Sequence, residues 1–115
     1  MKLNETIEKL GFKVFTPSST DPEIAGGYAS DMLSDVIAGA GRDFVWVTMQ
    51  THENVIAVAV LKDLAAIVLT GGRVPAVETL ELAKAKGVCV LGTRHSSFTI
   101  TGRLYEAGIG AGTGE

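Results

Sequence analysis

Apolar residues recur at helical spacings in some segments and form short continuous runs in others, and the two patterns predict different elements. Leu3, Ile7 and Leu10 follow one another at spacings of four and three, and Gly11 comes next. This spacing predicts a short amphipathic helix that ends at the glycine. Residues 12–15 predict a strand, which stops at a polar loop containing two prolines.

A regular alternation of strands and helices follows that loop. Ile24 opens a strand-like segment that passes through Gly26 and Gly27, and a helix is predicted over residues 32–40. The remaining strands are predicted at 44–49, 66–70 and 88–91, and the remaining helices at 53–62, 77–86 and 97–107.

The predicted central strands are apolar on both faces. Their sequences are "FVWVTM", "AAIVLT" and "VCVL", without the polar alternation of a half-exposed strand. Such strands are typical of a parallel sheet that helices cover on both sides. The sequence therefore predicts an α/β fold, a three-layer α/β/α sandwich with a mostly parallel central sheet.

Length and composition limit the classes of function. A chain of 115 residues with 46% hydrophobic residues predicts one domain over residues 1–109, followed by a flexible glycine-rich tail at 110–115. The net charge of -3 is scattered, so no basic stripe is available for nucleic acid. No segment approaches the roughly 20 apolar residues of a membrane span, and no signal peptide is recognisable. We expect no membrane partner, a cytoplasmic location and, because a partner subunit would help so small a domain to fold, homo-oligomerisation.

Two nucleotide-binding motifs are missing. A P-loop needs a lysine after its last glycine, and Gly71-Gly72 is followed by Arg73 instead. A dinucleotide fingerprint must follow a strand, whereas the glycine-rich "GIGAG" follows a predicted helix. Kinase or nucleotide-hydrolysis chemistry therefore has no local motif.

Polar residues gather where the predicted parallel strands end, which is where binding sites form in such folds. The segments at these ends contain Thr51-His52, Thr70-Gly71-Gly72-Arg73 and Arg94-His95. Two histidines do not complete a set of metal ligands, so no metal is expected. Their side chains either donate hydrogen bonds to an anionic ligand, helped by the arginines, or are solvated residues at the edge of the sheet.

Three further positions have both a structural and a chemical interpretation. Ser30 or Asp31 caps the helix at 32–40, or one of them is a nucleophile whose base the sequence does not show. Gly26-Gly27 allows a ligand or a second subunit to approach the backbone closely. Cys89 is a buried small apolar residue or a nucleophile, and its apolar surroundings favour burial.

Three blocks of sequence, in order, resemble the DRTGG domain family over residues 24–104. The blocks are "GGYASDMLSDV", "QTHENVIAVAVLKDLAAIVLTGGRVP" and "TLELAKAKGVCVLGTRHSSFTITGRL". The family name records an Asp-Arg pair after one strand and Thr-Gly-Gly after the next. Thr70, Gly71 and Gly72 supply the second half, whereas Thr51 and His52 stand where Asp and Arg are expected.

Members of this family occur alone, beside CBS domains and inside some phosphate acetyltransferases, and they resemble the N-terminal domain of HPr kinase/phosphorylase. The resemblance implies a stand-alone, dimeric regulatory module without a kinase domain, catalytic residue, cofactor or metal. It implies a small anionic ligand, such as a nucleotide or phosphorylated metabolite, or a metabolic enzyme as partner. The expected ligand-binding residues are Gly26, Gly27, Ser30, Asp31, Thr51, His52, Thr70, Gly71, Gly72 and Arg73.

Two alternatives to a ligand-binding module stay open. In the first, the glycine-rich loops and apolar edges pack against another subunit, and the domain serves protein interaction or oligomerisation without a small ligand. In the second, the domain is a small enzyme of unknown reaction that uses His52, His95, Ser30 or Asp31.

Overall fold

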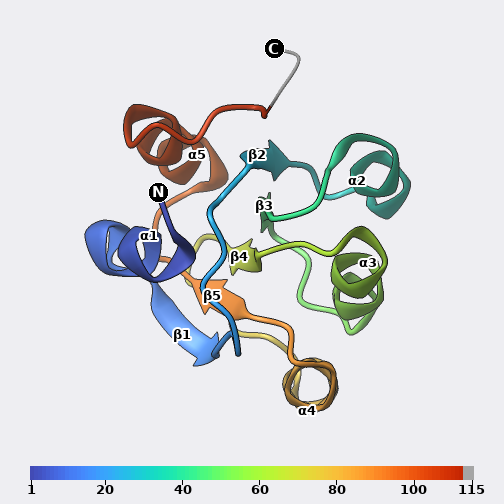
Figure 1. Cartoon of the computed structure of the whole chain (residues 1–115). Coiled ribbons are helices and arrows are strands. Elements are labelled where there is room, and N and C mark those ends of the chain that lie inside the picture. Colours follow the sequence, from blue (N-terminus) through green and yellow to red (C-terminus); the bar gives the residue numbers. More distant parts are fainter. Residues whose placement is uncertain (113–115) are drawn as a thin grey trace.

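The computed structural model describes residues 1–112 and contains helices and strands in the predicted order (Figure 1). The helices are α1 (Leu3–Leu10), α2 (Leu33–Gly39), α3 (Asn54–Lys62), α4 (Val77–Lys86) and α5 (Ser97–Glu106). The strands are β1 (Lys13–Thr16), β2 (Gly26–Ala29), β3 (Phe44–Thr48), β4 (Ala66–Leu69) and β5 (Val90–Gly92).

The strands form one five-stranded sheet in the order β1-β5-β4-β3-β2. Strands β2 to β5 run parallel, whereas β1 pairs antiparallel with β5, with Lys13 opposite Gly92. The beginning of β1 therefore lies at the edge where the parallel strands end. We call this edge, with the loops that follow β2 to β5, the carboxyl edge.

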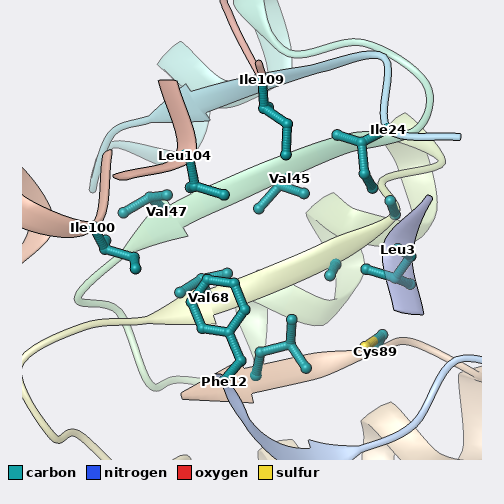
Figure 2. Close-up of a cluster of buried hydrophobic side chains, with 13 residues drawn as sticks. Leu3, Phe12, Ile24, Val45, Val47, Val68, Cys89, Ile100, Leu104 and Ile109 are labelled. Atoms are coloured by element: carbon teal, nitrogen blue, oxygen red, sulfur yellow. The ribbon is translucent and has the colours of Figure 1, made fainter. Parts of the chain in front are cut away.

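Helices cover both faces of the sheet, which confirms the predicted three-layer sandwich. Figure 1 shows α1 and α5 on one side and α2, α3 and α4 on the other. On the first side, Leu3, Phe12, Ile100 and Leu104 pack against the sheet (Figure 2). The strands supply apolar residues to both layers because successive side chains point to opposite faces.

Trp46 anchors the second core, between the sheet and α2, α3 and α4. Its side chain is fully buried, with Val36 and Ile56 in the same cluster. The indole Nε1 donates to the carbonyl oxygen of Ser30 at 2.8 Å, so the polar end of the ring has a partner. Its neighbours Val45 and Val47 point into the other core, which explains why this strand is apolar throughout.

The last described residues pack against β2, although the sequence predicts a flexible tail from residue 110. The amide of Gly27 donates to the carbonyl oxygen of Gly110 at 2.7 Å. Gly26 lies against the backbone of Gly112, where a Cβ would be only 2.9 Å from it. Residues 110–112 are thus part of the packed domain, and the rest of the predicted tail, 113–115, lies outside the described residues. Within residues 1–112, no helix is long and apolar enough to cross a membrane.

Candidate functional site

The Gly71–Gly72 turn joins two loops of the carboxyl edge. Both glycines have left-handed backbone angles, with φ of 67° and 73°, which side-chain-bearing residues rarely adopt. The amide of Gly71 donates to the carbonyl oxygen of His95 and that of Gly72 to the carbonyl oxygen of Thr93, each at 2.8 Å. The loop after β4 is thereby fastened to the loop after β5.

Thr70 is a buried link between the sheet and α5. Its side chain is 1% exposed, and its hydroxyl lies 2.8 Å from that of Ser97. Its amide donates to the carbonyl oxygen of Thr48 at 3.2 Å. Thr70 therefore stabilises the edge from within and offers no surface to a ligand.

A cavity of about 490 Å³ opens beside this turn. We call it the basic cavity, because three permanent cations and a histidine line it. Its walls come from the end of α1, from β1 and from the loops after β4 and β5. The lining residues are Leu10, Gly11, Lys13, Phe15, Gly72, Arg73, Val74, Gly92, Thr93, Arg94 and His95.

The basic groups of this cavity have no carboxylate partner among the residues that the structure describes. None of the acidic residues in that part of the chain belongs to the lining. Within residues 1–112, the ion pairs join Met1 to Glu23 and Arg42 to Asp63, away from the basic cavity. Positive charge that is gathered in a concave surface without counter-charges attracts anions.

Two contacts hold basic side chains of the cavity in place. The Nη1 atom of Arg73 donates to the carbonyl oxygen of Thr70 at 3.0 Å, and its guanidinium group lies over Gly71. The Nζ atom of Lys13 lies 5.0 Å from the ring centroid of Phe15, within range of a cation–π interaction. The Phe15 ring in turn packs on Gly92, where no Cβ would fit. An aromatic surface thus adjoins the cations.

Of the ten residues expected to bind a ligand, only Gly72 and Arg73 line the basic cavity. Gly26 and Gly27 lie at the start of β2, where Gly26 pairs with Phe44 at the start of β3. They are therefore at the opposite edge of the sheet, and the structure does not bring them to the cavity. Both lie beside the C-terminal residues, and at Gly26 a Cβ would be only 2.9 Å from the backbone of Gly112, which explains the need for glycine at that position.

Thr51 and His52 belong to the carboxyl edge but do not line the basic cavity. The carbonyl oxygen of Thr51 accepts hydrogen bonds from the Thr79 hydroxyl at 2.7 Å and from the Ala76 amide at 3.3 Å. His52 uses Nδ1 to accept a hydrogen bond from the amide of Asn54 at 3.2 Å. Both residues therefore shape the beginnings of α3 and α4.

Asp31 ties β2 to β3 and does not cap a helix. Its Oδ1 accepts hydrogen bonds from the Thr48 hydroxyl and the Met49 amide, both at 2.7 Å. Ser30 accepts from the amide of Met32 at 3.2 Å. The N-cap of α2 is Met32, without a side-chain bond, so the predicted capping by Ser30 or Asp31 is wrong.

The interpretation of Cys89 as a buried apolar residue is confirmed, since its side chain is 2% exposed. Burial raises the pKa of the thiol to about 12, which keeps it protonated at neutral pH. Within residues 1–112, no three His, Cys, Asp or Glu side chains lie close enough together to hold a metal ion.

Lys13 and Phe15 were not expected at this site. Parallel strands predict which loops meet, but nothing in the short segment 12–15 indicates that it runs antiparallel at the edge of the sheet. Arg94 and His95 are among the candidate donors to an anion that the sequence indicates, and both line the basic cavity. The basic residues in "TGGR" and "GTRH" are the signal in the sequence that indicates a positively charged site.

Comparisons with known proteins agree with this fold. The family model of the DRTGG domain matches residues 32–107, which run from the beginning of α2 to the end of α5. No curated protein sequence matches the chain.

A similar solved structure contains the CBS and DRTGG domains of the regulatory region of Clostridium perfringens pyrophosphatase, complexed with the activator diadenosine tetraphosphate. The TM-score is 0.66 at 18% sequence identity, which shows a shared fold. The alignment covers 86% of this chain and 44% of the other, so the chain spans less than half the length of that protein.

Proposed function

The chain belongs to the DRTGG domain family, and we propose that it is a non-catalytic regulatory module that binds a small anionic ligand, such as a nucleotide or phosphorylated metabolite. The observation that carries this proposal is the basic cavity, which is lined by Lys13, Arg73, Arg94 and His95 and by no carboxylate of the described residues. Its volume of about 490 Å³ falls in the range of small-molecule sites.

The chemistry of the lining favours a phosphate-bearing ligand. Arginine presents a planar set of donors that matches phosphate oxygens, and lysine adds a compact positive charge. Phe15, Leu10 and Val74 offer apolar surface beside these cations, suited to a base or another uncharged part of the ligand. A ligand with both a phosphate group and an uncharged part would contact the cations and the apolar surface of the cavity together.

The structural relative supports testing nucleotides first. That protein is a regulatory region crystallised with diadenosine tetraphosphate, a dinucleotide activator. We propose the same kind of role here: ligand binding to this module reports metabolic state to an enzyme partner in the cytoplasm.

A non-catalytic role also fits the candidate nucleophiles. The Cys89 thiol is buried and protonated, and the Ser30 hydroxyl accepts a backbone hydrogen bond. His52 uses one ring nitrogen to accept a hydrogen bond from the amide of Asn54, the first residue of α3. These contacts assign each group a structural task.

Thermal-shift screening of the unmodified chain against ATP, ADP, AMP, diadenosine tetraphosphate and a panel of sugar phosphates tests this proposal. A ligand at 100 times its dissociation constant stabilises the folded state by about 2.7 kcal/mol. The stabilisation should be markedly smaller in Arg94→Gln and unchanged in Arg103→Gln, which removes an equal charge from the exposed surface of α5. A flat response across the whole panel would contradict the proposal.

Self-association is the second candidate function, and the exposed apolar side chains of the carboxyl edge favour it. Met32 is 64% exposed, Met49 44% and Phe98 90%. Single exposed apolar residues are ordinary on protein surfaces. These three come directly after Asp31, Thr48 and Ser97 in the sequence, and hydrogen bonds join Asp31 to Thr48 and Ser97 to Thr70. We propose that they contact a second copy of the chain. Sedimentation equilibrium should show a dimer that Phe98→Asp dissociates, and a monomer at high concentration would exclude this candidate.

A further inference from the structure

Resting on the function proposed above, we propose that the basic cavity recognises a polyphosphate chain through cationic side chains alone. In this proposal the Gly71–Gly72 turn is a clasp that positions those side chains and does not contact the ligand.

The glycine amides are already engaged. A phosphate-binding glycine loop works by directing unpaired N–H groups at the anion. Here the amides of Gly71 and Gly72 donate to the carbonyl oxygens of His95 and Thr93 at 2.8 Å. A ligand that used them would first have to break the connection between the two loops.

The clasp holds the segment that carries Arg94. Its two hydrogen bonds end on Thr93 and His95, the residues on either side of that arginine. The same turn leads directly into Arg73, whose guanidinium group returns to the carbonyl oxygen of Thr70 at 3.0 Å. One two-residue turn thereby sets the positions of arginines from two different loops.

The distribution of the cations favours several linked anionic groups over one. Lys13 comes from β1, Arg73 from the loop after β4, and Arg94 with His95 from the loop after β5. A single carboxylate or monophosphate can make short contacts with only part of such a set. A chain of phosphates carries charge along its length and can contact groups on separate walls.

Calorimetric titration of the unmodified chain with AMP, ADP, ATP and inorganic tripolyphosphate tests the ligand class. Affinity should rise about tenfold or more from AMP to ATP, tripolyphosphate should bind, and raising salt from about 50 to about 200 mM should weaken ATP binding several-fold. If AMP binds as tightly as ATP, the polyphosphate inference fails and the proposed function stands. If no phosphate compound binds, both fail.

A double-mutant cycle tests the clasp. Gly72→Ala places a side chain at a φ of 73° with open space around it. Gly87→Ala, directly after α4, also places a side chain in open space, at a φ of 69°. Gly72→Ala should weaken ATP binding about tenfold, whereas Gly87→Ala, the matched control for backbone strain, should leave the affinity unchanged.

The cycle also separates positioning from direct contact. If Gly72 acts through Arg94, the loss caused by Gly72→Ala should shrink to about twofold or less in an Arg94→Gln background. Equal losses in both backgrounds would show that the turn contacts the ligand directly. An unchanged affinity in the single variant would show that the turn is structural only, and either result would overturn the clasp.

Discussion

The amide nitrogen of Gly72 lies 2.8 Å from the carbonyl oxygen of Thr93, and this bond joins the loops that follow two neighbouring strands. The Thr-Gly-Gly segment, which gives the family half of its name, thus forms its hydrogen bonds with other parts of the same domain. Thr70 is buried against Ser97, and the glycines connect the loop after β4 to the loop after β5. The arginines beside this segment, Arg73 and Arg94, line the basic cavity and are the groups that we propose to face the ligand.

Alanine at Gly72, or at Gly87 after α4, should destabilise the domain. Gly72→Ala and Gly87→Ala should each lower the free energy of unfolding by about 1 kcal/mol, because the left-handed backbone conformation is unfavourable for a residue with a Cβ. Urea denaturation with an unchanged m-value is the measurement. Equal stability of Gly72→Ala and the unmodified chain would show that the turn relaxes freely.

Gly71→Ala should have an additional effect on Arg73. A Cβ at this position would meet the guanidinium group, which lies at the end of a flexible side chain and can move away. We expect a stability loss of about 1 kcal/mol, as at Gly72, together with loss of the Arg73 Nη1 contact to Thr70. A crystal structure of the variant checks the position of Arg73, and an unmoved guanidinium group would contradict the expectation.

Removing the Asp31 carboxylate should destabilise the connection between β2 and β3. Asp31→Ala leaves the buried Thr48 hydroxyl and the Met49 amide without their acceptor, at a cost of roughly 1–3 kcal/mol. Asp31→Asn should cost less, because its amide oxygen can still accept both bonds. Chemical denaturation measures both variants, with Glu81→Ala on the surface of α4 as the control. A loss no larger than that of the control would show that Asp31 is only a surface carboxylate.

Cys89 should resist alkylation in the folded protein. Burial raises its pKa from 9.0 to about 12, so the reactive thiolate is scarce at neutral pH and the sulfur is covered. Iodoacetamide should modify the chain readily in urea and slowly without it, as followed by mass spectrometry. Rapid modification of the folded chain would reopen the interpretation of Cys89 as a nucleophile.

The same pKa shift predicts a dependence of stability on alkaline pH. The thiol ionises near pH 9 in the unfolded chain and near pH 12 in the folded one. Its contribution to the free energy of unfolding is therefore complete below pH 9 and declines as the pH rises toward 12. Cys89→Ala should show a smaller decline over that interval in denaturation experiments, and an identical slope would contradict the assignment.

The order of elements followed from the sequence because the apolar strands and the helical spacings are strong local signals. Residues 66–70 are apolar and end at Thr-Gly-Gly, and the structure has a strand at Ala66–Leu69. The direction of β1 could not be predicted, since a four-residue edge strand carries no information about its partner. That direction brings Lys13 to the carboxyl edge.

The site was harder to predict because polar residues at the ends of strands also hold the fold together. Asp31, Thr51 and Thr70 all lie at the carboxyl edge, as expected, but their hydrogen bonds go to other parts of the chain. Gly26 and Gly27 are among the expected ligand-binding residues, but they begin a strand and so lie at the opposite edge. Arg73, Arg94 and His95 differ from these residues, because they line the basic cavity and form no ion pair with the acidic side chains of residues 1–112.

Calorimetric titration of ATP into the unmodified chain, Arg94→Gln and Arg103→Gln tests the central claim most directly. The basic cavity predicts saturable binding to the unmodified chain and to Arg103→Gln, with affinity at least about tenfold weaker in Arg94→Gln, because an unneutralised cation is removed from the cavity wall. Equal affinity in both variants, or no heat of binding in any of the three proteins, would contradict it.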